Sequence, residues 1–349
     1  MKKIIIILLF FVLFSCSNLD NGKEPVFSDK KENNNNFSFS EFKTSDKKLD
    51  QLALDANNYY LNKDYENAIK SYIKLEENGV NLNSNQVFNL FNSFLYSQKF
   101  KEALAILYNM METSSQKEKF TGFRIEENDL SQNIVNLNER IFKQGNLTDT
   151  NLVEYAKLMY KAGDYYYDYD NQKYYFAILI HYISAYLILE DAQKINPENP
   201  DIYFYKGRLL MDITGDFYQA ELELKKAISL KTDHFEYYYR LGNAYMHQDK
   251  VVLAKENFLK GIELNDNYEK LYLNLGNMNF LLGEDQEGYD NYNKGLKVCH
   301  EMCDSFYFNI GKELYNSGKY EEGRKSVEKA YEINPSEEKY KRTLDSFKK

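Results

Sequence analysis

The sequence predicts an all-α fold in which helical hairpins stack one on another as an α-solenoid. Small residues recur at a fixed period in the C-terminal half, and apolar residues at helical spacing accompany them. Only four prolines occur in 349 residues, so long helices with brief turns are expected. Because 43% of the residues are hydrophobic, the chain can bury a sizeable core.

The first fifteen residues have the composition of an export signal. Two lysines precede the apolar run IIIILLFFVLF, which is too short for a comfortable membrane span. The next segment, LFSC, resembles the lipobox of bacterial lipoproteins: Leu13, Ser15 and Cys16 match, whereas Phe14 is larger than the usual residue. The resemblance implies that residues 1–15 are removed and that Cys16 is acylated, giving a lipid anchor. An ordinary signal peptide or an uncleaved anchor is the alternative.

Residues 16–48 are predicted to be a flexible tether. They are polar and rich in asparagine, without a sustained apolar period, so they cannot bury enough surface to order themselves. About thirty such residues span roughly 30 Å on average. Within the lipoprotein resemblance, Ser17 stands where many inner-membrane lipoproteins carry aspartate, which favours the outer membrane. The net charge of −9 argues against nucleic acid as a partner.

Three series of small residues repeat every 34 or 35 residues. The first is Gly207, Gly242, Gly276 and Gly311. The second is Ala220, Ala254, Gly288 and Gly323. The third is Ala227, Gly261, Gly295 and Ala330. Turn signals fall between the first and second series, so each unit is interpreted as two helices of about a dozen residues joined by a tight turn.

The small residues are explained by close packing of the two helices. Tyr238, Leu241 and Gly242 lie on one stripe of a first helix, and Phe258 lies on the facing stripe of the second. Glycine inside a helix costs about 1 kcal/mol relative to alanine. Burial of an aromatic ring beside it stabilises by about 1.5–3 kcal/mol, so close approach is favoured.

This pattern resembles the tetratricopeptide repeat family. The residues that carry the resemblance in the clearest repeat are Tyr238, Leu241, Gly242, Tyr245, Ala254, Phe258 and Gly261. The resemblance implies a right-handed superhelix whose first helices line a concave surface that reads extended peptides. It predicts two degenerate repeats over residues 49–115, a helical connector over residues 116–150, and five repeats plus a capping helix over residues 151–349. Ser336 is expected to be the N-cap of that capping helix.

The first of the five repeats is interrupted by a tyrosine-rich insert, residues 164–175. The apolar segment that follows, residues 176–189, is hydrophobic almost all round, which predicts burial on several sides. Three interpretations stay open for it: extra core, a face that docks a partner, or a membrane span. In a related alternative, this helix lines a pocket for a small molecule.

Two rows of residues mark a candidate peptide-binding groove. A polar residue directly follows the small residue of four first helices, and we call these residues the polar ladder: Arg208, Asn243, Asn277 and Lys312. Four residues before each of them stands a member of the apolar row: Phe204, Tyr239, Leu273 and Phe308. Amides can bind a peptide backbone, and cations can hold carboxylates, so an extended peptide is the predicted ligand. A solvated polar stripe is the alternative.

Catalytic and cofactor motifs are not found. The four histidines are scattered, and no phosphate-binding glycine loop, dinucleotide fingerprint or Ser/His/Asp order appears, so we expect neither an enzyme nor a bound cofactor. The segment CHEMC is compatible with a disulfide between Cys299 and Cys303, with a zinc or copper site, or with two free thiols. A disulfide suits an exported protein, and no metal is expected.

Together these features predict a lipid-anchored scaffold that gathers other envelope proteins or peptides, for example in outer-membrane protein assembly. The alternative is a small-molecule-binding or enzyme-associated lipoprotein that uses the long apolar helix.

Overall fold

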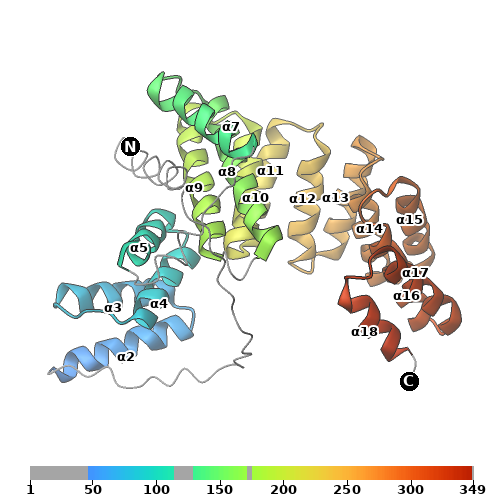
Figure 1. Cartoon of the computed structure of the whole chain (residues 1–349), viewed down its shortest axis with the longest axis horizontal. Coiled ribbons are helices and arrows are strands. Elements are labelled where there is room, and N and C mark those ends of the chain that lie inside the picture. Colours follow the sequence, from blue (N-terminus) through green and yellow to red (C-terminus); the bar gives the residue numbers. More distant parts are fainter. Residues whose placement is uncertain (1–45, 114–128, 171–174, 348–349) are drawn as a thin grey trace, which may run out of the picture. The chain divides into compact units, whose positions relative to one another are not determined.

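A computed structural model describes residues 46–113, 129–170 and 175–347 of the chain. Every regular element in these ranges is a helix, which confirms the all-α prediction. The chain divides into two units, residues 1–197 and residues 198–349 (Figure 1). Cys16 and the predicted signal segment lie outside the described residues.

Unit 1 begins with two hairpins and a short connector. The hairpins are α2 (Lys47–Leu61) with α3 (Tyr65–Glu77), and α4 (Ser84–Tyr96) with α5 (Phe100–Thr113). The connector is α7 (Asp129–Asn138), which continues into the π-helical turn η1 (Glu139–Lys143). Asp46 caps α2 by accepting a hydrogen bond from the backbone N–H of Lys48 at 2.8 Å. The last two residues assigned to the tether therefore belong to α2.

The longest hairpin of the structure closes unit 1. It consists of α8 (Asp149–Asp170) and α9 (Tyr175–Ile195), with 22 and 21 residues. Residues 164–170 of the predicted insert continue α8 as helix, and residues 171–174 lie outside the described residues. Residues 178–189 of α9 are all buried, which is what extra core requires. Among the described helices none has the length and hydropathy needed to cross a bilayer.

Unit 2 consists of four hairpins and a terminal helix. In chain order these are α10 (Pro200–Thr214) with α11 (Phe217–Leu230), α12 (Phe235–Met246) with α13 (Val251–Leu264), α14 (Glu269–Leu281) with α15 (Asp285–Val298), α16 (Cys303–Asn316) with α17 (Tyr320–Ile333), and α18 (Glu338–Ser346). Each second helix packs against the first helix of the next hairpin. The first of the five predicted repeats therefore lies in unit 1 and the other four in unit 2.

The hairpin turns share one backbone conformation. In unit 2, a residue with positive φ stands two positions before each second helix: Gly215 at 66°, Asp249 at 58°, Gly283 at 74° and Gly318 at 85°. Glycine adopts this left-handed region without steric cost, whereas at Asp249 the Cβ atom makes the same conformation sterically unfavourable. The turn glycines of the sequence therefore fix where the first helices end.

Close approach of the paired helices is confirmed at the small residues. A Cβ added to Gly242 would lie 2.5 Å from a ring carbon of Phe258 on the partner helix. A Cβ added to Gly207 would lie 2.8 Å from Cγ of Leu224. Both distances are far below van der Waals contact, so only glycine lets these rings and side chains fill the space between the helices.

The last described helix, α18, packs against α17, and its start differs from the prediction. Glu337, not Ser336, is the N-cap of α18, and it accepts from the backbone N–H of Lys339 at 3.4 Å. The Ser336 hydroxyl instead donates to Asn334 Oδ1 at 2.7 Å. The main anchor of the helix is Tyr340, which is fully buried.

Candidate functional site

The four residues of the polar ladder lie on the first helices of unit 2. Each follows a glycine that faces the second helix, so it is turned by about 100° from that contact. Their exposure differs: Lys312 is exposed, Arg208 and Asn277 are half-buried, and Asn243 is buried. The four ladder residues therefore differ in solvent exposure and do not form a uniformly solvated stripe.

The two ladder asparagines are held by hydrogen bonds between neighbouring hairpins. Asn274 Nδ2 donates to Asn243 Oδ1 at 2.8 Å, and Asn309 Nδ2 donates to Asn277 Oδ1 at 3.2 Å. Asn277 Oδ1 also accepts from the hydroxyl of Tyr292, which reaches it from the second helix of the same hairpin. The oxygen of each ladder amide is thus committed inside the protein, which orients its NH₂ group.

The same arrangement occurs in unit 1. There the Tyr72 hydroxyl donates to Asn57 Oδ1 at 2.6 Å, and Asn89 Nδ2 donates to the Tyr72 hydroxyl at 3.2 Å. Burial raises the pKa of Tyr72 to about 12, so this hydroxyl stays protonated and can donate. A tyrosine–asparagine–asparagine contact is therefore a recurring element of these hairpins.

The two ladder cations lie over aromatic rings. The Arg208 guanidinium carbon is 5.7 Å from the ring centre of Phe204 and 5.6 Å from that of Tyr205. Lys312 Nζ is 5.7 Å from the ring centre of Phe308. These separations are within the range of cation–π attraction, which holds the positive groups on the first-helix face.

The apolar row is only partly exposed, which corrects the sequence interpretation. Phe204 and Leu273 are 2% and 7% exposed, so neither can contact a peptide in this structure. Phe204 packs on Tyr237 with ring centres 4.8 Å apart, and Leu273 belongs to the core around Phe306. Each is covered because the next hairpin stacks over it, a contact that the pattern within one helix does not show.

Tyr239 and Phe308 remain half-buried members of the row. The ring of Tyr239 meets that of Tyr268 nearly perpendicularly, with centres 5.2 Å apart. Burial, and then the neighbouring Tyr239, raise the pKa of Tyr268 to about 12, and the positive charge of Arg240 opposes the rise. Aromatic rings and guanidinium groups therefore share the face formed by α10, α12 and the start of α14.

The sequence interpretation missed Asn274 and Asn309, which orient the ladder amides. A signal for them is present, because the two residues stand 35 positions apart, one repeat period, on α14 and α16. Asn274 lies three residues before Asn277, and Asn309 lies three residues before Lys312. Their role could not be read from one helix, since each acts on the preceding hairpin.

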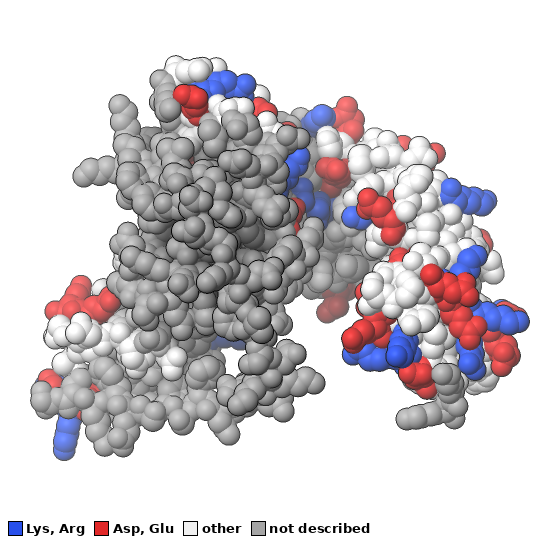
Figure 2. All heavy atoms as spheres, viewed as in Figure 1, with Lys and Arg blue, Asp and Glu red and all other residues white. Residues whose placement is uncertain are grey.

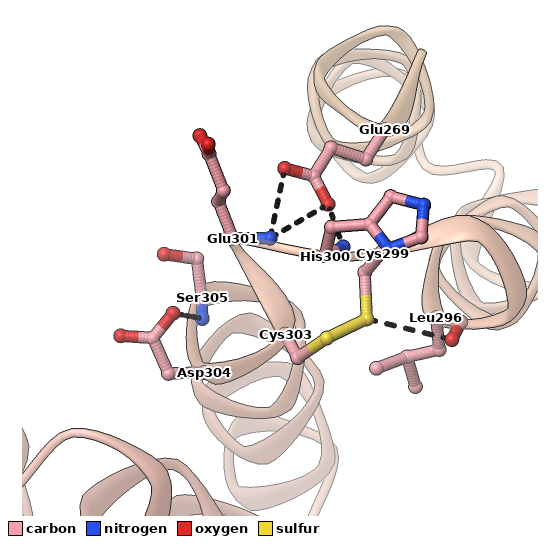
Figure 3. The surroundings of a disulfide bond; sticks show 8 residues. All are labelled: Glu269, Leu296, Cys299, His300, Glu301, Cys303, Asp304 and Ser305. Carbon is pink, nitrogen blue, oxygen red and sulfur yellow. Dashed lines mark hydrogen bonds between the residues drawn. A yellow bond between two sulfur atoms is a disulfide. The ribbon is translucent and has the colours of Figure 1, made fainter. Parts of the chain in front are cut away.

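Cys299 and Cys303 form a disulfide that closes the turn between α15 and α16, with Cα atoms 5.5 Å apart (Figure 3). The buried carboxylate of Glu269 accepts from the backbone N–H of His300 at 2.6 Å and of Glu301 at 3.4 Å. Of the three alternatives for this segment, the structure contains the disulfide. Within the described residues, no group of His, Cys, Asp and Glu side chains converges in a way that could hold a metal ion.

Stacked hairpins joined through small residues define a helical-repeat protein of the α-solenoid class. The tetratricopeptide repeat model matches residues 235–268 and 304–337, which contain α12 with α13 and α16 with α17. These two hairpins of unit 2 are therefore tetratricopeptide repeats, as the residue pattern predicts.

Similar proteins extend the comparison. Human protein O-mannosyl-transferase TMTC3 is 28% identical over 108 residues, which are 31% of this chain and only 12% of TMTC3. The solved structure of MamA is 28% identical, with a TM-score of 0.42 over 46% of this chain and 92% of MamA. TTC0263 of Thermus thermophilus is 19% identical, with a TM-score of 0.44 over 55% of this chain and 98% of TTC0263. TM-scores below 0.5 do not establish a common overall arrangement.

Proposed function

We propose that this chain is a lipid-anchored envelope protein that binds an extended segment of a partner protein along the first helices of unit 2. It acts as a scaffold and carries out no chemistry itself. The observation that supports this most directly is the fixed orientation of the ladder amides by Asn274 and Asn309.

The amide orientation suits a peptide backbone. Because the oxygens of Asn243 and Asn277 already accept internal hydrogen bonds, only their NH₂ groups are left to donate. Asn277 is half-buried and can offer this group to a ligand, whereas Asn243 is only 9% exposed. Neither NH₂ group donates to any described residue. Carbonyl oxygens of an extended peptide are the matching acceptors, and prepositioned donors reduce the entropy lost on binding.

Charge and aromatic groups add selectivity. Arg208 and Lys312 stand at the two ends of the ladder and can pair with carboxylates of the ligand. Tyr239 and Phe308 offer half-buried rings beside them. The preferred ligand is therefore an extended, acidic segment with apolar side chains.

The N-terminal sequence supports a location at a membrane. A lipid on Cys16 and the tether up to residue 46 would keep the folded units near a membrane, with the outer membrane favoured by Ser17. Partners would then be other envelope proteins. Mass spectrometry of the purified N-terminal peptide tests the anchor directly: an acylated Cys16 is expected, and an unmodified N-terminus upstream of it would contradict the anchor.

Photocrosslinking in intact cells tests the binding face. A photoreactive amino acid at Lys312, on α16, is expected to capture one defined partner. The same amino acid at Lys325, an exposed position on α17, is the matched control and is expected to capture much less. A discrete partner captured equally from both positions, or from Lys325 alone, would contradict peptide binding on the first helices.

A further inference from the structure

The most exposed large apolar side chains of unit 2 gather at the turns within its hairpins. Within residues 198–347, five such side chains are more than half exposed, and four of them lie within three residues of an intra-hairpin turn. We call these four the turn-edge residues: Tyr218 (66% exposed), Val252 (55%), Leu281 (68%) and Tyr320 (60%). The fifth, Leu222, is one helical turn from Tyr218.

Stacking places these turns along one edge of unit 2. Neighbouring hairpins pack through α11 and α12, α13 and α14, and α15 and α16, so successive intra-hairpin turns follow one another (Figure 1). All four hairpins contribute one turn-edge residue each. The turns between hairpins form the other edge, where polar segments such as KTDH (231–234) and NPSE (334–337) stand. The intra-hairpin edge therefore carries the most exposed apolar side chains of unit 2, although the opposite edge also exposes Ile333 (49%) and Leu264 (37%).

We propose that this turn edge rests on the surface of a lipid bilayer. Separate apolar tips at successive turns fit shallow insertion into an interface. Tyrosine suits this position because its ring is apolar and its hydroxyl stays in the polar headgroup layer. The proposal rests on the lipid anchor at Cys16, which would keep the chain at a membrane for the edge to meet.

Charge at the edge favours a zwitterionic surface. Asp216, Asp249 and Glu284 accompany Lys250 and Lys319 at the same turns, so the edge has no excess of positive charge. Figure 2 likewise shows side chains of both signs intermixed over the C-terminal helices. Insertion is thus driven by the apolar tips and should change little with salt, unlike binding by a polybasic patch.

The absence of tryptophan gives a direct test, because any introduced tryptophan is the only one in the chain. Tyr320→Trp and Ile333→Trp place the reporter at the first and last residues of α17, about 20 Å apart along one helix. The two native side chains are 60% and 49% exposed, so the variants are matched. The full lipidated chain is bound to phosphatidylcholine vesicles whose acyl chains carry bromine, which quenches nearby tryptophan.

The expected result is a several-fold quenching at position 320 and at Leu281→Trp, with little at position 333. Equal quenching at both ends of α17, or none at 320 and 281, overturns the proposal. A blue shift at 320 without bromine quenching also overturns it, because the edge is then buried in a protein contact.

Failure of the anchor is distinguished by a second preparation. The chain from residue 16, with an N-terminal hexahistidine tag, is held on the same brominated vesicles by a nickel-chelating lipid. In one outcome the first preparation does not float with vesicles, but the second shows stronger bromine quenching at position 320 than at position 333. The lipid anchor at Cys16 is then wrong, and membrane contact by the turn edge is supported. If the second preparation shows no difference, the docking edge is wrong whatever the state of Cys16.

Discussion

At the scale of single residues, the contact among a tyrosine, an amide and the next hairpin's amide explains why asparagine follows the small residue. In two hairpins a tyrosine hydroxyl completes this contact, at Asn57 and at Asn277. At Asn243 the corresponding second-helix residue is Phe258, so among the described residues only Asn274 donates to the oxygen. The ring at this position fills space in all three hairpins, and the hydroxyl is an addition to it.

Phe258→Tyr is therefore expected to stabilise unit 2 by about 0.5–1 kcal/mol, the net value of one hydrogen bond. Burial of a hydroxyl without a partner is unfavourable, so the prediction requires that Oδ1 of Asn243 accepts a hydrogen bond from the new hydroxyl. Thermal or denaturant unfolding measures it. Phe258→Tyr combined with Asn243→Ala is the control and should lose the gain; destabilisation by Phe258→Tyr alone would contradict the contact.

A carboxylate network sets the expected pH dependence. Glu221 is buried, which by itself raises its pKa, but hydrogen bonds from Lys225 at 2.5 Å, Lys250 at 2.9 Å and Gln248 at 3.1 Å outweigh burial. They hold its pKa at about 2, below the ordinary 4.5. Because the folded-state pKa is lowered, the stabilisation is full above pH 4.5 and is lost as the pH falls towards 2.

Comparison of Glu221→Gln with the native chain tests this. At pH 7 the variant is expected to be less stable by about 1–2 kcal/mol, since the lysines are partly exposed to solvent. Between pH 4.5 and 2 the difference between the two should shrink. A stability difference that does not change over this range would show that the network contributes nothing through ionisation.

At the scale of elements, hairpin packing depends on two kinds of glycine. Gly242 is helical and lies against Phe258, whereas Gly318 has a φ of 85° and open space around its Cα. The first kind is required by sterics between helices and the second by the backbone. Both keep the period of the sequence, so both are visible before the structure.

Alanine substitution should separate the two. Gly242→Ala is expected to destabilise by about 1–2 kcal/mol net, because overpacking exceeds the gain in helix propensity. Gly318→Ala is expected to cost about 1 kcal/mol through left-handed strain. Phe258→Leu in the Gly242→Ala background should cost less than in the native chain, whereas it should cost the same beside Gly318→Ala. Equal costs in all three backgrounds would contradict the steric account.

At the scale of the whole molecule, the repeat period predicted the hairpins of unit 2 but not what neighbouring hairpins cover. Phe204 and Leu273 share a helix face with the ladder, yet the next hairpin buries them. Residues 164–170 of the tyrosine-rich insert lengthen α8, which the sequence did not predict, because helical spacing does not mark where a longer helix ends. The superhelical path of the repeats stays a prediction.

The central claim is that the ladder amides donate to a bound peptide from a fixed orientation. Asn277→Asp tests it most directly, because a carboxylate oxygen still accepts from Tyr292 and Asn309 while the NH₂ donor is replaced by a negative charge. The measurement is the Kd of a synthetic peptide covering the segment crosslinked to position 312, by calorimetry on the full chain. Asn57→Asp, in the equivalent contact of unit 1, is the matched control. The account predicts at least a tenfold weaker Kd for Asn277→Asp with the unfolding midpoint of the native chain, and no change in Kd for Asn57→Asp. An unchanged Kd for Asn277→Asp would contradict it.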